Sequence, residues 1–137
     1  MTRRVILLFG MLALAACHAG VEPDCDRDPT YSFSEMPAAA TGAVCEVVFS
    51  APGKEARYSF PPLLDCADNA KPVPCVETAG PRPTGCEISG CWVRLDFKGA
   101  TGQELFQYLG RYIFTYTINC DDSPVSSGTV EPIGCGV

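Results

Sequence analysis

The cysteines of this 137-residue chain are its most reactive side chains, and there are nine of them against a single histidine, His18. A thiol can act as a nucleophile, bind zinc or pair in a disulfide. A catalytic Cys–His or Ser–His pair needs a histidine in the folded part, and His18 lies near the N-terminus. The close spacings C-x8-C and C-x4-C also differ from the paired C-x2-C of zinc sites. We therefore expect disulfides, and no enzyme, bound metal or cofactor.

The start of the chain sets one cysteine apart. Arg3 and Arg4 precede twelve apolar residues, 5–16. That run is shorter than the roughly 20 residues that cross a bilayer core, and it has the layout of a secretory signal. The tetrapeptide Leu14-Ala15-Ala16-Cys17 resembles the lipobox of bacterial lipoproteins. The resemblance implies that residues 1–16 are a signal peptide and that an acylated Cys17 attaches the mature chain to the lipid bilayer.

Two alternatives concern how the chain is exported. An ordinary signal peptide cut near Ala16 or Ala19 would leave Cys17 as a plain cysteine. Residues 2–7 also resemble a twin-arginine signal, but a fold that needs disulfides cannot mature in a reducing cytosol. His18 is not the aspartate that retains enterobacterial lipoproteins at the inner membrane, so the lipoprotein resemblance implies a location in the cell envelope at the outer membrane.

Eight cysteines remain once Cys17 is set aside, and an even number in an exported chain predicts a disulfide framework. Each bridge adds about 2–4 kcal/mol of stability. We expect Cys66–Cys75 and Cys86–Cys91 to close local loops. Cys45–Cys120 would link apolar strand faces across the two sheets, and Cys25–Cys135 would tie the entry segment to the C-terminus.

The charge of the mature chain limits its partners. Removal of residues 1–16 takes away two arginines and no acid, so eight basic and sixteen acidic side chains remain, a formal charge of −8. Such a surface repels phosphate backbones and anionic lipid head groups, which argues against nucleic-acid binding and leaves attachment to the lipid. The acidic residues beside the cysteines lack the spacing of a helical calcium loop. A protein or a glycan remains as the partner.

The lipobox resemblance implies a lipid anchor at the start of residues 17–42, and polar and chain-breaking residues indicate that the rest of this segment is a tether. Residues 43–137 are expected to form a single β domain. Alternating apolar residues predict strands at 43–50, 56–60, 91–97, 111–120 and about 127–133. A short helix is expected at 102–109. The run Thr101-Gly102-Gln103-Glu104 has the form of a capping box, and Gly110 follows as a C-terminal cap.

The segment 61–85 holds six of the twelve prolines, so we expect a Pro-rich connection and no central strand. It is either a recognition surface or a structural insertion. The aromatic residues offer a second possible binding surface, as a sugar or peptide platform, although alternating strands more often bury such rings. These residues are Trp92, Phe106, Tyr108, Tyr112, Phe114 and Tyr116.

The run from Leu109 to Ile118, LGRYIFTYTI, resembles the penultimate strand of bacterial immunoglobulin-like sandwiches. There a Gly-x-Tyr leads into alternating aromatics, and the tyrosine, here Tyr112, can form a corner with upstream backbone. The chain as a whole resembles small cysteine-rich lipoproteins of Gram-negative bacteria. Together these features predict a mainly β, disulfide-stapled antiparallel β-sandwich of immunoglobulin-like type.

The leading functional prediction is a non-enzymatic, membrane-anchored envelope lipoprotein with a binding or structural β-domain. One alternative is an inhibitor that presents a constrained loop to an envelope or extracellular enzyme. Another is a hydrolase that uses a pair of carboxylates. A protruding convex loop at 61–85 would favour the inhibitor, and a deep cleft with two facing acids would favour the hydrolase.

Overall fold

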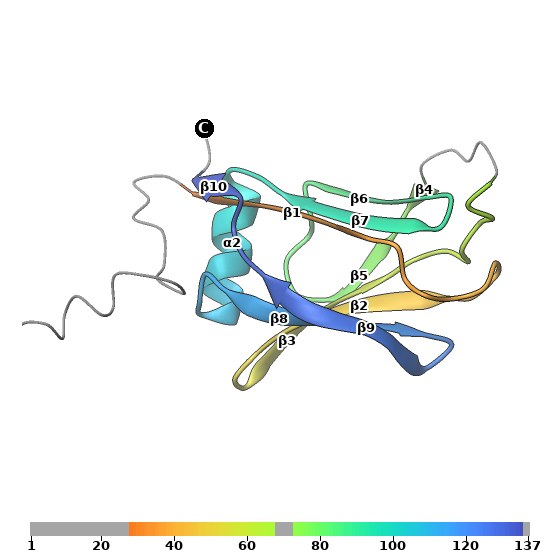
Figure 1. Cartoon of the computed structure of the whole chain (residues 1–137). Coiled ribbons are helices and arrows are strands. Elements are labelled where there is room, and N and C mark those ends of the chain that lie inside the picture. Colours follow the sequence, from red (N-terminus) through yellow and green to blue (C-terminus); the bar gives the residue numbers. More distant parts are fainter. Residues whose placement is uncertain (1–27, 68–72, 136–137) are drawn as a thin grey trace, which may run out of the picture.

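The computed structural model describes residues 28–67 and 73–135, and they fold into two antiparallel sheets packed face to face (Figure 1). The first sheet has the order β10-β1-β7-β6-β4 and the second the order β5-β3-β2-β8-β9. The first sheet contains β1 (Pro29–Glu35), β4 (Val73–Pro74), β6 (Gly85–Ser89), β7 (Trp92–Phe97) and β10 (Gly134–Cys135). The second contains β2 (Cys45–Ala51), β3 (Lys54–Ser59), β5 (Val76–Ala79), β8 (Phe114–Cys120) and β9 (Ser123–Val130), and the one helix is α2 (Ala100–Leu109). The prediction of a mainly β sandwich with a short helix is confirmed.

The strand order follows that of immunoglobulin variable-type sandwiches. In those domains strands B, E and D are neighbours in one sheet, and C″, C′, C, F and G are neighbours in the other. Here β1, β7 and β6 take the places of B, E and D, and β5, β3, β2, β8 and β9 take the other five. The segment that resembled a penultimate immunoglobulin strand is therefore the F-position strand, β8.

Aromatic rings join the two sheets where an antibody domain has its inter-sheet disulfide. Phe49 of β2 lies 5.2 Å from Phe114 and 5.5 Å from Phe33 between ring centroids, and 6.0 Å from Phe97. Phe33 and Phe97 belong to the first sheet, whereas Phe49 and Phe114 belong to the second. Tilted and edge-on contacts of this kind add to the free energy gained from burying the rings, so this cluster is the centre of the core.

The expected tyrosine corner forms with a different donor. The hydroxyl of Tyr31 in β1 donates to the backbone carbonyl of Tyr112 at 2.8 Å, and the Tyr112 ring stacks on Phe106 at 4.0 Å. Tyr112 thus takes part through its carbonyl and its ring face. The corner fixes the start of β8 against the first sheet.

Residues 29–35 form strand β1, although the sequence analysis placed them in the tether. Tyr31 and Phe33 are buried and alternate with Ser32 and Ser34, so the segment has the pattern of a half-buried strand. The signal peptide 1–16, Cys17 and Cys25 lie outside the described residues.

Helix α2 closes one end of the sandwich (Figure 1). Leu105 and Leu109 are buried, and Gly110 is a left-handed cap whose N–H bonds to the carbonyl of Phe106. The predicted capping box is wrong, because the N-cap is Gly99 and no side chain caps the helix. Thr101 lies within the first turn instead.

The cysteine pairing agrees with the prediction for Cys45–Cys120 and differs for the other two described pairs, which are Cys66–Cys91 and Cys75–Cys86. The register of the β6–β7 hairpin explains the difference. Cys86 pairs with Leu95, and three further residue pairs of the hairpin separate it from the turn that contains Cys91. These two cysteines are therefore too far apart to form a local bridge. The Cys25–Cys135 bridge remains a prediction, because Cys25 lies outside the described residues.

Cys45–Cys120 also holds a different place from the one expected. Both residues face each other across neighbouring strands β2 and β8 of the second sheet, with Cα atoms 4.0 Å apart. The bridge therefore staples one end of a single sheet and does not link the two sheets.

Candidate functional site

Four connections meet at the end of the sandwich opposite α2, which we call the loop end. The helix lies where β7 ends and where β1 and β8 begin, whereas the loop end lies where β1 and β8 end (Figure 1). In variable-type immunoglobulin domains the corresponding end carries the antigen-binding loops. The four connections are residues 36–44, residues 60–67, the β6–β7 turn at 90–91 and the β8–β9 turn at 121–122.

Backbone hydrogen bonds join these connections into one layer. The connection after β3 bonds to the one before β2 and to the β6–β7 turn, and the β8–β9 turn bonds to the residue that precedes β2. The donor–acceptor pairs are Gly42 to Leu63 at 2.7 Å, Leu63 to Ala43 at 2.9 Å, Leu64 to Gly90 at 3.2 Å and Asp121 to Val44 at 2.8 Å. Because loops with paired backbone are held in one conformation, the loop end is a preformed surface.

Two disulfides strengthen the same layer. Cys45–Cys120 closes the ends of β2 and β8, directly beside the β8–β9 turn. Cys66–Cys91 ties the connection after β3 to the β6–β7 turn, with Cα atoms 4.8 Å apart. Strands from both sheets are thus fixed at this end by covalent bonds. A rigid scaffold that presents loops is a common arrangement for binding sites.

The β8–β9 turn holds two aspartates in a backbone conformation that favours glycine. Asp121 has φ of 52° and Asp122 has φ of 68°, and they are the only non-glycine residues with positive φ among those described. Two positive φ values in a two-residue hairpin turn usually require Asn-Gly or Gly-Gly. The Asp121 carboxylate accepts a bond from the Val44 N–H at 3.0 Å, which helps to stabilise the turn. The arrangement places two carboxylates at the exposed tip.

Exposed apolar side chains are concentrated at the loop end. Of the six large hydrophobic residues that are more than a third exposed in the described part of the chain, four lie in or beside its connections. Asp65, Asp121 and Asp122 are exposed in the same connections. The four are Met36 at 47%, Val44 at 50%, Leu64 at 38% and Trp92 at 44%. An apolar surface with a charged rim is characteristic of protein-binding sites.

A hollow of about 370 Å³ lies beside Trp92 on the outer face of the first sheet. Arg94 forms one wall, and Asp96 holds its guanidinium at 3.1 Å while accepting a second bond from Ser32 at 2.7 Å. The remaining walls are small or acidic. The lining residues are Ser34, Glu87, Ser89, Trp92 and Arg94.

The six aromatic residues considered as a platform do not lie on one surface. Phe114 is in the core, Phe106 and Tyr112 stack on each other, and Tyr116 packs against Phe33. Tyr108 lies under the Lys54 ammonium and donates to the backbone of Glu55. Trp92, at 44%, is the most exposed of the six.

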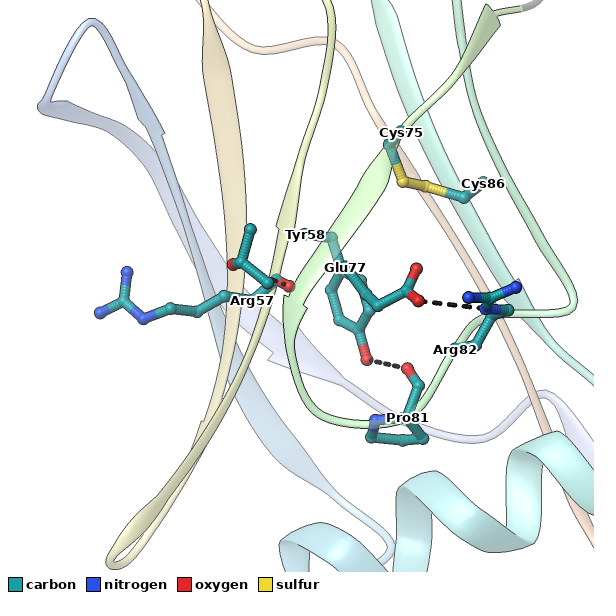
Figure 2. Close-up of a disulfide and its surroundings, with 8 residues drawn as sticks. Arg57, Tyr58, Cys75, Glu77, Pro81, Arg82 and Cys86 are labelled. Atoms are coloured by element: carbon teal, nitrogen blue, oxygen red, sulfur yellow. Dashed lines mark hydrogen bonds and ion pairs between the residues drawn. A yellow bond between two sulfur atoms is a disulfide. The ribbon is translucent and has the colours of Figure 1, made fainter.

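The Pro-rich segment 61–85 crosses from one sheet to the other. Strand β4 pairs with β6 at the edge of the first sheet, and β5 pairs with β3 at the edge of the second. Cys75 lies between β4 and β5, and its bridge to Cys86 of β6 fixes the crossing point (Figure 2). Both strands lie at sheet edges, as the prolines predicted.

Polar contacts hold the second half of segment 61–85 against the sandwich (Figure 2). The Tyr58 hydroxyl donates to the carbonyl of Pro81 at 2.8 Å, and burial raises the pKa of this hydroxyl. Glu77 and Arg82 form an ion pair at 3.0 Å; backbone hydrogen bonding and this pair lower the pKa of Glu77. These groups have structural partners, so we assign them no chemistry.

The carboxylates beside the cysteines also have structural partners. Asp65 accepts the N–H of Ala67, and Asp121 accepts that of Val44. Within residues 28–67 and 73–135, no group of three or more metal-binding side chains comes together.

Comparison of the chain with protein-family models, with curated proteins and with solved structures finds no match. The one described helix lacks the length and the apolar character needed to cross a membrane. We therefore infer function from the residues and the geometry of the loop end.

Proposed function

We propose that this protein is a membrane-anchored lipoprotein of the cell envelope, without enzymatic activity, whose β-sandwich binds another protein through the loop end. The observation that carries the proposal is the concentration of exposed apolar side chains on a surface held by two disulfides. Preformed surfaces bind with a smaller loss of conformational entropy than mobile ones.

The direction of the chain supports this arrangement. The described residues begin at the α2 end, where the carbonyl of Pro29 packs against Gly102. The seven residues of β1 then lead to the loop end, a distance of about 23 Å at the usual rise of a strand. An anchor at Cys17 would therefore join the domain at the α2 end and leave the loop end directed away from the bilayer.

The surface also indicates the chemistry of its partner. The apolar side chains need complementary apolar anchors, and the acidic rim of Asp65, Asp121 and Asp122 favours lysines and arginines around those anchors. We infer a protein surface with an apolar centre and a basic rim. Its charge complements the acidic balance of the whole chain.

The two alternative functions lack a specific supporting observation in the described residues. The segment 61–85 is fastened along the edges of both sheets, whereas a protruding loop would favour the inhibitor. Four hollows on the described surface are shallow, and none of these four is lined by a pair of carboxylates.

Matched charge substitutions test the binding surface. Val44→Asp with Leu64→Asp puts two charges into the apolar loop end, and Val76→Asp with Ile133→Asp puts the same charges on exposed apolar residues elsewhere. Each form is used to co-purify crosslinked envelope partners, which are identified by mass spectrometry. We expect the first pair to lose a partner that the wild type and the second pair both retain. Retention by all three forms, with equal melting temperatures, would refute the loop-end site.

A further inference from the structure

Strand β9 is an unusually open sheet edge. The other edge strands of the described sheets are β4 and β10, with two residues each, and β5, with four. Proteins usually protect edges by keeping them short, by adding charged residues or proline, or by a bulge. Strand β5 is short, carries the Glu77–Arg82 ion pair and has a register shift against β3. Strand β9 has eight residues.

The protective features of β9 are confined to its beginning. Pro124 and a register shift lie near the turn, and from Ser126 to Val130 five consecutive residues pair regularly with Ile118 to Phe114 of β8. The outer side of this stretch is unpaired among the described strands, because β9 ends the order of its sheet. Its outward N–H and C=O groups can therefore accept another strand.

Strand β9 and its neighbour β8 contribute no charge to the surface around this edge, where Glu35 of β1 places one carboxylate that accepts a bond from the Ser126 hydroxyl at 3.3 Å. Neither β8 nor β9 contains a charged side chain, in a chain with 26 charged residues. Ser50, Thr115 and Thr129 lie side by side across β2, β8 and β9. Interface centres are depleted of charged residues compared with the rest of a protein surface, and this ribbon shows such a depletion.

Gly128 lets β9 lie directly against the Tyr116 ring. A Cβ atom at this position would lie 2.7 Å from the Tyr116 ring, so no larger residue fits without displacing that ring. Tyr116 in turn packs against Phe33 of the first sheet at 4.8 Å. The open edge is thus supported by the core, which favours a stable geometry for pairing.

We propose that the outer edge of β9 at residues 126–130 pairs antiparallel with the same strand of a second copy of this chain. The second copy is favoured because most self-contacts of so acidic a chain bring like charges together, whereas this ribbon is uncharged. A two-fold axis through the edge makes the contact isologous and closed. With the axis at Gly128, Ser127 of each copy lies opposite Thr129 of the other, and such hydroxyl side chains form favourable cross-strand pairs. The two second sheets become one continuous sheet.

Sedimentation velocity of the full exported protein, in detergent of matched density, tests this proposal over a dilution series. Thr129→Lys places a charge on β9, and Thr78→Lys places the same charge on the exposed face of the other edge strand, β5. We expect a wild-type dimer that dissociates on dilution. Because the two added lysines then lie at diagonal positions on one face across the two-fold axis, where like charges repel, Thr129→Lys should weaken the dimer about tenfold or more, while Thr78→Lys leaves it within about twofold.

Hydrogen exchange locates the contact independently of the substitutions. The amides of residues 126–130 should exchange more slowly at high protein concentration, whereas those of β5 should not change. Ser127→Lys replaces Thr129→Lys if the latter melts early. A monomer at every concentration, or a dimer that Thr129→Lys and Ser127→Lys leave unchanged, would overturn the proposal. If Val44→Asp with Leu64→Asp abolishes the dimer and neither lysine variant does, the self-association surface is the loop end instead of β9.

Discussion

At the scale of single residues, the burial of a side chain follows from its position along a strand, whereas its hydrogen-bond partner follows from the assembly of the sheets. Phe114 and Ile118 are buried and Trp92 is exposed, as the alternation along each strand predicted. The identity of a side chain's partner depends on sheet register, which one strand does not encode. Tyr112 illustrates this, because its carbonyl, and not its hydroxyl, makes the corner contact with Tyr31.

Phe114 tests the aromatic core. It is 3% exposed and contacts the rings of Tyr31 at 5.3 Å and Phe49 at 5.2 Å. Phe114→Ala leaves a cavity between the sheets, so we expect a loss of about 3–5 kcal/mol in the free energy of unfolding by urea. Trp92→Ala is the surface control, with a change of about 0.5 kcal/mol or less. Equal losses in the two variants would contradict this core.

Tyr58 predicts how stability depends on alkaline pH. Burial, and to a smaller extent the charge of Glu77, raise the pKa of its hydroxyl above the usual 10.0. The folded state therefore holds this proton more tightly than the unfolded state does, so the contribution is complete below pH 10.0 and is lost as the pH rises above it.

We expect Tyr58→Phe to be less stable than the wild type at neutral pH by about 1 kcal/mol, because the bond to Pro81 is lost. Its free energy of unfolding should nevertheless fall less steeply than that of the wild type above pH 10.0. Urea titrations at a series of pH values measure both quantities. Parallel curves for the two proteins would show that folding does not raise the pKa of Tyr58.

At the scale of elements, the sequence predicted five of the ten strands in the described residues, and β1 is the longest of those it missed. Alternation located β2, β3, β7 and β8 to within a few residues, and Gly110 located the end of α2. The alternation of Tyr31 and Phe33 with serines was also present, but acidic residues and prolines before it favoured a tether. Short edge strands such as β4 carry too few residues to show a period.

Helix α2 depends on one glycine whose role is visible only in three dimensions. A Cβ on Gly102 would collide with the carbonyl oxygen of Pro29, and Phe97 lies close on the other side. Alanine normally stabilises a helix by about 1 kcal/mol relative to glycine. We expect Gly102→Ala to do the opposite and to lower the melting temperature, because α2 must move away from β1.

Gln103→Ala is the control for this substitution, since it changes the next residue of the same helix. Thermal unfolding followed by circular dichroism separates the two variants. A Gly102→Ala protein that is as stable as the wild type would show that α2 does not pack this closely on β1.

At the scale of the whole molecule, the loop end could not be predicted from the sequence. Its exposed apolar residues Met36, Val44, Leu64 and Trp92 are scattered over more than fifty positions, and single exposed apolar residues have no meaning by themselves. The fold brings them to one end because β1 and β3 end there and β2 and β7 begin there. The pairing Cys66–Cys91 depends on the same assembly.

The anchor is a prediction that concerns the whole chain. We expect the mature wild-type protein to begin at an acylated Cys17 and to fractionate with membranes. Cys17→Ser should carry no acyl mass and should enter the soluble fraction, because each buried methylene contributes about 0.8 kcal/mol to membrane affinity. Intact-mass spectrometry and density fractionation measure both properties. An unacylated wild type, or a Cys17→Ser protein that stays on the membrane, would contradict the anchor.

The central claim, that an anchored sandwich binds a protein through its loop end, is tested most directly by photo-crosslinking in living cells. A photoreactive amino acid is placed at Met36 or Leu64 of the loop end, or at Gln107 on α2 at the opposite end. We expect a defined adduct with one protein from the first two positions and none from Gln107. An adduct from Gln107 alone, or equal adducts from all three positions, would contradict it.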